Sequence, residues 1–339
     1  MNYQLMTQDQ IEKAAAKCGV TVDLWKTVQD RMASIQFGIE IEMLVPVALL
    51  QRHNVRVGGY GNRSSIPMDA QGFPKMCVGY DSSLSGYCTD DEGRRISTKG
   101  IEVSSKILTL ADLPMLIDWL AWVNENLAPK VNKSCGLHIH IDVDKCCGGN
   151  AGAAKVARFL TADVKNTSIF NVALYSQTGS LYRFNTYYGR QITDSEKTRF
   201  DADIAAGRIP MVGRTTYLQT QVYNRQGTME FRAFAATTNM HKVLHHLWTA
   251  LAISEMSIYG AETAGSRYRW NGKFTAARDG AKALKSLHAT VGHLGRQDPN
   301  GIMDSNMRAM RSKAREMADK FTARVLNREA RTGSTFVGM

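Results

Sequence analysis

Three segments of the sequence carry pairs of ionisable residues that stand two positions apart within otherwise apolar runs. The segments are FGIEIEM, CGLHIHIDV and GTMEFRAFAA, and their pairs are Glu40 with Glu42, His138 with His140, and Glu230 with Arg232. Period-two alternation of this kind is typical of a half-buried strand. Successive side chains of a strand leave opposite faces, so the two members of each pair are expected on one face. The sequence therefore predicts three strands that each present two polar groups to one side.

The simplest interpretation of any one such strand is a sheet with one solvated face. A single His-x-His or Glu-x-Glu pair is a weak signal, because histidines spaced in this way also occur as core or hydrogen-bonding residues. Solvated faces, however, usually mix Lys, Thr, Ser and Gln, whereas these three pairs contain only carboxylate, imidazole and guanidinium groups. We therefore expect the three strands to share one polar concavity.

Several carboxylates in one concavity raise one another's pKa, and burying them unpaired is costly, unless cations neutralise them. A bound metal would do so. Oxygen ligands with imidazole and no thiolate favour Mg²⁺ or Mn²⁺ over zinc, and Mg²⁺ held by a few carboxylates typically also binds substrate phosphates. Arg232 fits this chemistry as a planar donor to phosphate oxygens. The residues thus predict phosphoryl transfer supported by a divalent cation.

These groups must be positioned by a sheet and its flanking helices. The pattern predicts strands over 36–46, 75–84, 100–108 and 135–143, a hairpin of 215–224 with 227–236 joined by NRQG, and helices over 109–128 and 151–175. The Gly-, Asn- and Ser-rich segment 52–72 is expected to be a mobile loop or flap. After the hairpin the chain is expected to be mostly helical.

No linker stands out in the sequence, which favours one α+β domain with a central, largely antiparallel sheet and helices packed on it. We expect an N-terminal helical segment over 1–35, the sheet-bearing catalytic domain over 36–260, and a basic helical extension over 261–339 that packs on the same domain.

Composition excludes several classes of protein. With 44% apolar and 22% charged residues over 339 positions, the chain is neither disordered nor fibrous. The most apolar helical stretch, 243–260, is interrupted by His245, His246 and Glu255, which favours a buried helix over a membrane span. The N-terminus lacks a basic start before an apolar core, so we expect no signal peptide and a cytoplasmic protein. The six cysteines show no paired metal-binding spacing and are expected to be reduced.

The net charge of +11 predicts attraction to polyanions such as nucleic acid, nucleotide phosphates or an acidic polymer. Part of the excess lies in 306–333, where apolar residues recur at helical spacing and the basic residues fall on other faces. That helix surface is either simply solvated or an anionic docking site, and the sequence leaves both open.

The order of motifs along the chain resembles a known family. The Glu-x-Glu strand is followed by YDSSL, GIEVSS, CGLHIHID and GTMEFRAFAATTN. This order resembles the amidoligases, the phage and bacterial branch of the carboxylate–amine ligases related to glutamine synthetase and glutamate–cysteine ligase. The resemblance covers roughly residues 36 to 250 and is most specific in CGLHIHID and GTMEFRAFAATTN. It implies a glutamine synthetase-like catalytic fold: a curved antiparallel sheet, or incomplete barrel, with helices packed on its outer face.

The resemblance also implies residue roles. The metal ligands it assigns are Glu40, Glu42, Glu102, His138 and Glu230. Arg232 would contact the transferred phosphate, while His140 would face nucleotide and substrate and could help to remove a proton from the amine. Glu102 is assigned to catalysis as well as to metal binding, and Arg214 joins Arg232 and His140 in binding the nucleotide. Asp81 matches an acidic turn whose role the resemblance leaves open.

The activity implied is ATP-dependent joining of a carboxylate to an amine with Mg²⁺ or Mn²⁺. The γ-phosphoryl group would pass to the carboxylate, and the amine would displace phosphate from the acyl phosphate to form an amide or isopeptide bond. The substrates would be small molecules or peptides, and a phage-encoded enzyme would act in the host cytoplasm. The acid, the amine and the oligomeric state are left open, and segment 52–72 has no counterpart in the family.

Two alternatives remain. A metal-dependent hydrolase could use the His-x-His strand, although such enzymes usually gather more histidines; zinc-supported turnover without ATP would favour it. A non-catalytic basic protein with a ligase-like fold could bind nucleic acid or another polyanion; salt-sensitive binding without nucleotide turnover would favour that alternative.

Overall fold

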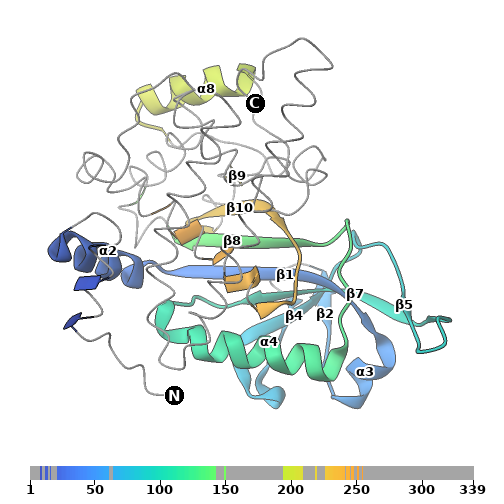
Figure 1. Cartoon of the computed structure of the whole chain (residues 1–339). Coiled ribbons are helices and arrows are strands. Elements are labelled where there is room, and N and C mark those ends of the chain that lie inside the picture. Colours follow the sequence, from blue (N-terminus) through green and yellow to red (C-terminus); the bar gives the residue numbers. More distant parts are fainter. Residues whose placement is uncertain are drawn as a thin grey trace, which may run out of the picture.

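The computed structural model describes residues 21–60, 64–142, 194–208 and 226–240, together with 8–9, 12–13, 16, 149, 218–219, 242–244, 246–247, 250–251 and 254. It is a mixed α+β structure built on one large sheet (Figure 1). The helices with described bounds are α2 (Val22–Ser34), α3 (Val47–Arg52), α4 (Leu113–Leu127) and α8 (Asp194–Ala205). Two short 3-10 turns, η2 (Asp69–Gln71) and η3 (Leu110–Asp112), precede β4 and α4. Among the described helices, none combines the length and apolar character needed to cross a membrane.

The sheet has eight described strands in the order β2-β4-β7-β1-β8-β10-β9, and β3 also pairs with β4. Their bounds are β1 (Phe37–Pro46), β2 (Gly58–Tyr60), β3 (Ile66–Met68), β4 (Phe73–Tyr80), β7 (Thr98–Ser105), β8 (Gly136–Asp142), β9 (Leu218–Gln219) and β10 (Thr228–Ala235). The three strands predicted to carry polar pairs, β1, β8 and β10, are adjacent in the sheet. The predictions of these three strands and of the β9–β10 pairing are confirmed.

The expectation of an antiparallel sheet holds for every described pair except one. Strand β2 runs parallel to β4, with Gly58 opposite Gly79, so the sheet is mixed. Strands β3 and β2 both pair with β4: β3 runs antiparallel to it, and β2 pairs with its last two residues. The segment 52–72, expected to be a mobile loop, therefore supplies two edge strands and η2 within its described part.

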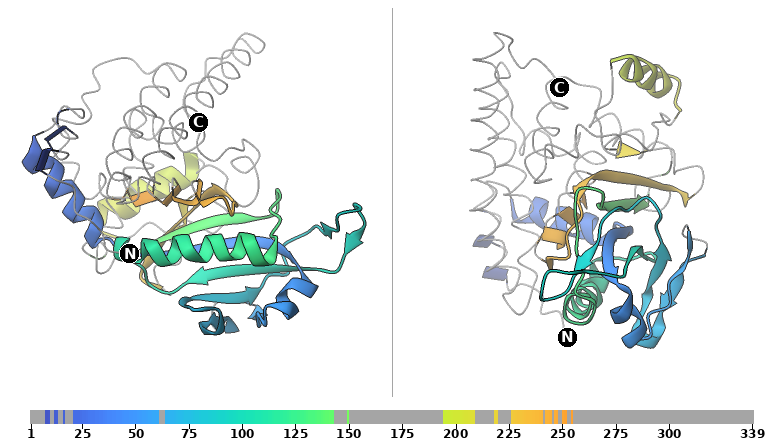
Figure 2. Two further views of the ribbon diagram at one scale, coloured as in Figure 1. Left: turned by 60° about the horizontal axis from the view of Figure 1, so that its bottom comes forward. Right: turned by 90° about the vertical axis from the view of Figure 1, so that its right-hand side faces the viewer.

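The core lies between the sheet and α4. On β1 the alternate side chains Phe37, Ile39, Ile41, Met43 and Val45 are buried. Helix α4 runs along the sheet (Figures 1 and 2). Its buried side chains recur every three or four residues and are Leu113, Leu116, Trp119, Leu120, Val123 and Leu127. This spacing gives the helix one apolar stripe, which packs on the apolar face of the sheet and leaves the opposite face to the polar residues.

The start of α4 is defined by its sequence. Thr109 and Asp112 form a capping box at η3, in which the side chain of each accepts from the backbone N–H of the other. Lys75 of β4 forms an ion pair with Asp112 at 2.7 Å, which ties the start of α4 to the sheet. The predicted order of helix 109–128 followed by a strand is therefore confirmed.

Several elements were not predicted. Strands β5 (Cys88–Thr89) and β6 (Arg95–Ile96) form a separate two-stranded sheet between the predicted strands 75–84 and 100–108, and α3 follows β1 directly. Helix α8 lies in a part of the chain for which no element was predicted. The predicted helix 151–175, the predicted extension 261–339 and Arg214 all lie outside the described residues.

Candidate active site

The strand register brings the predicted polar residues onto one face of the sheet. In antiparallel pairs, residues directly opposite each other project to the same side. Glu40 lies opposite His138, and Glu42 lies opposite Glu102. Glu230 lies opposite His140 across the β8–β10 pair. The central sheet thus places carboxylates and imidazoles from four adjacent strands side by side.

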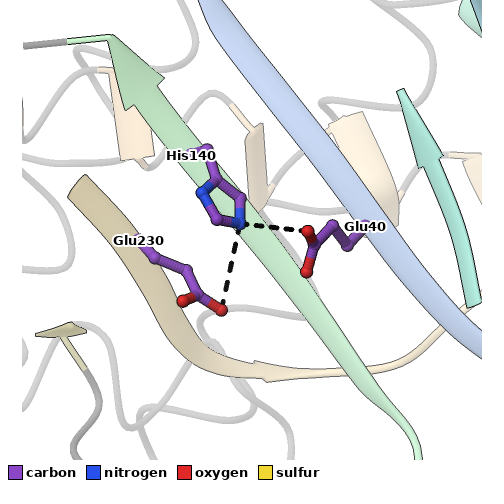
Figure 3. A group of neighbouring side chains, drawn as sticks. All are labelled: Glu40, His140 and Glu230. Carbon is purple, nitrogen blue, oxygen red and sulfur yellow. Dashed lines mark ion pairs between the residues drawn. The ribbon is translucent and has the colours of Figure 1, made fainter. Parts of the chain in front are cut away.

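A first group consists of Glu40, His140 and Glu230, whose ligand atoms lie within 4.8 Å of one another. His140 Nε2 is 3.3 Å from Glu40 Oε1 and 3.9 Å from Glu230 Oε1, so the ring stands between the two carboxylates (Figure 3). The other ring nitrogen, Nδ1, is 3.0 Å from the hydroxyl of Thr228. This contact fixes the plane of the ring and directs Nε2 at the carboxylates.

A second group consists of Glu42, Asp81 and Glu102, whose oxygens also lie within 4.8 Å of one another. The backbone N–H of Gly136, the first residue of β8, donates to Glu42 Oε2. Asp81 Oδ1 accepts from the backbone N–H of Ser83 at 2.7 Å. Each of these two carboxylates therefore has one oxygen held by a backbone donor.

Asp81 reaches the polar face because the chain after β4 passes over Gly100 of β7. A Cβ at position 100 would come within 2.8 Å of the Asp81 carbonyl oxygen and 2.9 Å of the Leu84 side chain. The Asp81 N–H donates to the Gly100 carbonyl at 3.2 Å, which holds the crossing in place. Glycine at position 100 thus permits the close approach that brings Asp81 to Glu102.

His138 lies between the two groups. Its Nδ1 is 3.2 Å from Glu40 Oε2 and 3.3 Å from Glu230 Oε1, and its Nε2 is 3.9 Å from Glu42 Oε1. The side chain is almost fully buried at 2% exposure. It can therefore orient the carboxylates of both groups as well as supply a ring nitrogen to a metal.

Arg232 contacts the first group through a single carboxylate. Its Nη1 donates to Glu230 Oε1, and its Nε is buried without a hydrogen-bond partner in the described part of the chain. The side chain is 15% exposed. The guanidinium therefore keeps a buried donor at the edge of the carboxylate cluster, where an anionic oxygen could accept from it.

The site carries more carboxylates than the described cations beside it can neutralise. Burial raises the pKa of the Glu102 carboxyl to about 9, and repulsion by Glu40, Glu42, Asp81 and Glu230 adds to the effect. In the absence of a metal, Glu102 is therefore protonated at neutral pH. A divalent cation would relieve this repulsion, so the donor set fits Mg²⁺ or Mn²⁺, whose preferred ligands are carboxylate oxygens.

In the first group, the neighbouring charges lower the pKa of a carboxyl group instead of raising it. Burial would raise the pKa of Glu40, but the charge of His140 and hydrogen bonds from His138 and His140 lower it well below its usual range. Burial also lowers the pKa of His140, yet Glu40 and Glu230 outweigh it and raise the value above that of free histidine. The two carboxylates of this group therefore favour the protonated form of His140.

The structure accordingly brings together the predicted residues Glu40, Glu42, Glu102, His138, His140, Glu230 and Arg232. It adds Asp81, which was noted in the sequence without a role. The signal for Asp81 was an acidic residue directly after a strand that neighbours the Glu102 strand. Because Arg214 lies outside the described residues, its role in binding the nucleotide stays a prediction.

Comparison with known proteins identifies a family. A family described as "Putative amidoligase enzyme" matches residues 33–254, which is more than half of the chain. A similar solved chain comes from the crystal structure of the complex between the prokaryotic ubiquitin-like protein Pup and its ligase PafA. The match is 8% identical, covers 88% of this chain and 67% of that one, and has a TM-score of 0.38. No curated protein matches the chain. The family match shows that the chain belongs to the amidoligase family of enzymes.

Proposed function

We propose that this amidoligase is an ATP-dependent carboxylate–amine ligase that forms an amide or isopeptide bond through an acyl phosphate. The observation that carries the proposal is the pair of neighbouring ligand groups on one sheet face, with His138 between them. Five carboxylates in two adjacent groups are suited to holding divalent cations against a polyphosphate. The glutamine synthetase-like barrel, with its polar residues on the concave face, is part of the same proposal.

Each of the two groups would bind one metal ion. Glu40, His140 and Glu230 would hold one Mg²⁺ or Mn²⁺, and the carboxylates Glu42, Asp81 and Glu102 would hold another. When bound, these ions neutralise phosphate charge and orient the transferring group. His138 would orient Glu40 and Glu230 through its Nδ1, in the manner of the outer hydrogen-bond partners that tune metal ligands.

The remaining residues act on the substrates. Arg232 forms an ion pair with Glu230, and its buried Nε would donate to an oxygen of the transferring phosphoryl group. The attacking amine must lose a proton, and a carboxylate of this face that is not saturated by metal would take it. We infer that the carboxylate substrate belongs to a small molecule or a peptide.

The proposal is tested by titrating purified protein with ATP in the presence and absence of Mg²⁺, using calorimetry. Glu230→Gln removes one charge and one ligand from the first group, so it should abolish metal-dependent binding while the protein stays folded. Glu125→Gln is the matched control, because Glu125 is an exposed residue of α4. That variant should bind ATP like the wild type.

Catalysis is measured by incubating the protein with ATP, Mg²⁺, pools of carboxylic acids and hydroxylamine. Hydroxylamine is a general amine that converts acyl phosphates to hydroxamates, so a productive acid should give ADP and a hydroxamate in equal amounts. Failure of ATP to bind with any divalent ion would contradict the proposal. Turnover of amides with zinc and no ATP would instead identify a hydrolase.

A further inference from the structure

Two loops meet at the edge of the second ligand group. The 81–87 loop follows β4 and begins with Asp81, and the 128–135 loop joins α4 to β8. The second loop ends immediately before Gly136, whose N–H donates to Glu42. Each loop therefore positions one component of the second group: the first places the Asp81 carboxylate, and the second places the donor that orients Glu42.

Asn132 and Ser134 connect the two loops. The Asn132 side-chain amide donates to the Ser85 carbonyl at 2.7 Å, and the Ser85 N–H donates to the Ser134 hydroxyl at 3.2 Å. The Asn132 amide oxygen accepts from both the N–H and the hydroxyl of Ser134, at 2.8 and 2.7 Å. The Asn132 carbonyl accepts from the Cys135 N–H at 3.1 Å. We call the three residues Ser85, Asn132 and Ser134 the Asn132 bridge.

Packing beside the bridge holds both loops against β1. Cys88, which follows the first loop, and Cys135 of the second are each buried with Leu44 in one apolar cluster. Gly86 has a φ of +145°, and a Cβ there would come within 2.6 Å of the Asn132 amide nitrogen and 2.7 Å of Leu44. The loops can therefore approach each other this closely only with glycine at this position.

We propose that Asn132 and Ser134 are positioning residues of the second ligand group: through the bridge they fix the Asp81 carboxylate and the Gly136 N–H relative to Glu42. The inference rests on the proposed function, because it assigns these residues to a group that binds metal there. Asn132 acts on Asp81 through the 81–87 loop, in which the Ser83 N–H donates to Asp81 Oδ1 at 2.7 Å.

The connection from the bridge to Glu42 involves fewer residues than the connection to Asp81. Ser134 and Cys135 lead directly into Gly136, and the Asn132 side chain and carbonyl hold the N–H groups of Ser134 and Cys135. The turn that ends at Gly136 is therefore fixed by Asn132. Loss of this turn would let the Gly136 N–H move away from Glu42 Oε2, and the carboxylate would lose its orientation.

The experiment compares three variants with the wild type by Mn²⁺ titration and by amide hydrogen exchange. Asn132→Ala removes the donor to Ser85 and the acceptor for Ser134. Ser134→Ala removes the bridging hydroxyl, whereas Ser134→Thr retains it. The matched control is Asn126→Ala, because the Asn126 amide donates within α4 to the Trp122 carbonyl, at 2.8 Å. All measurements use the full chain.

We expect Asn132→Ala and Ser134→Ala to weaken Mn²⁺ binding by about three- to tenfold, the loss typical of one or two hydrogen bonds. Exchange of the Ser83 and Gly136 amides should accelerate in both variants. Ser134→Thr should restore both measurements, and Asn126→Ala should leave both unchanged. A merely structural role would lower thermal stability without changing Mn²⁺ affinity or these two amides selectively.

Wild-type affinity and unchanged exchange in Asn132→Ala would overturn the inference. If the wild type binds no Mn²⁺, the proposed function fails. The exchange measurement alone then tests whether the Asn132 bridge positions Asp81 and the Gly136 N–H. Faster exchange at Ser83 and Gly136 in Asn132→Ala would still support the positioning role, whereas unchanged exchange would overturn it as well.

Discussion

Glu102 lies directly opposite Glu42 in the β1–β7 ladder, so two carboxylates face each other on the same side of the sheet. Like charges directly opposite one another destabilise a sheet. The chain accommodates them because burial and neighbouring carboxylates raise the pKa of Glu102 to about 9, which keeps it neutral. Without a metal, the pair is therefore tolerated because Glu102 carries a proton, and the proposed metal would have to displace that proton.

The first prediction is that metal binding releases this proton. Metal ligands must be deprotonated, so the apparent Mn²⁺ affinity should rise with pH up to about 9, by at most about tenfold per pH unit for one proton. Calorimetry in buffers of different ionisation enthalpy counts the protons released. Glu102→Gln should bind Mn²⁺ more weakly and lose the part of the pH dependence that extends to about pH 9, whereas the contribution of His140 to the first group should remain. A wild-type affinity that does not change from neutral pH to about 9 would contradict the prediction.

The second prediction concerns stability without metal. The folded-state pKa of Glu102, about 9, lies above the ordinary value of 4.5, so between these values the folded protein binds the extra proton. Raising the pH through this window therefore lowers the free energy of unfolding, by at most about 1.4 kcal/mol per pH unit for one group. Thermal unfolding in EDTA should show this loss. Glu102→Gln should reduce this dependence of stability on pH, whereas Glu125→Gln should keep the wild-type dependence.

The third prediction separates the two histidines. We assign His140 as a ligand of the first group and His138 as the residue that orients Glu40. His140→Ala should therefore abolish Mn²⁺ binding at the first group, while His138→Asn, which can still donate to Glu40, should weaken it by about tenfold. Mn²⁺ titration followed by electron paramagnetic resonance measures both. The reverse order of effects would assign the metal to His138, as the sequence resemblance implied.

Much of the site could be predicted because alternation fixes which side chains share a strand face. Glu40 with Glu42 and His138 with His140 needed only period two and their apolar neighbours. The grouping across strands could not be derived in this way, because register depends on contacts between distant segments. The resemblance supplied Glu102, and the ladder then placed it opposite Glu42.

Several features could not be predicted from the sequence, for different reasons. Strands β5 and β6 have two residues each, which is too short for periodicity to be detected. Strand β2 pairs parallel and β3 antiparallel with β4, and no local sequence pattern records such pairings between segments. Asp81 joined the ligand set through a crossing over Gly100, and glycine in a strand signals close approach without naming the partner.

The last prediction tests that crossing. In Gly100→Ala the new Cβ would lie 2.8 Å from the Asp81 carbonyl oxygen and 2.9 Å from the Leu84 side chain, so the loop must move away from β7. Asp81 should then leave the second group, and Mn²⁺ affinity should fall about as far as it does in Asp81→Asn. Titration of both single variants and of the wild type measures the two losses.

The double variant separates this cause from general damage. Because Gly100→Ala and Asp81→Asn act on the same carboxylate, their effects on Mn²⁺ binding should not add. Gly93→Ala is the control, since Gly93 has a φ of +78° but no atom within 4 Å of the position that a Cβ would take. It should lose some stability and keep its Mn²⁺ affinity. Additive losses in the double variant would show that Gly100 supports the site by some route other than Asp81.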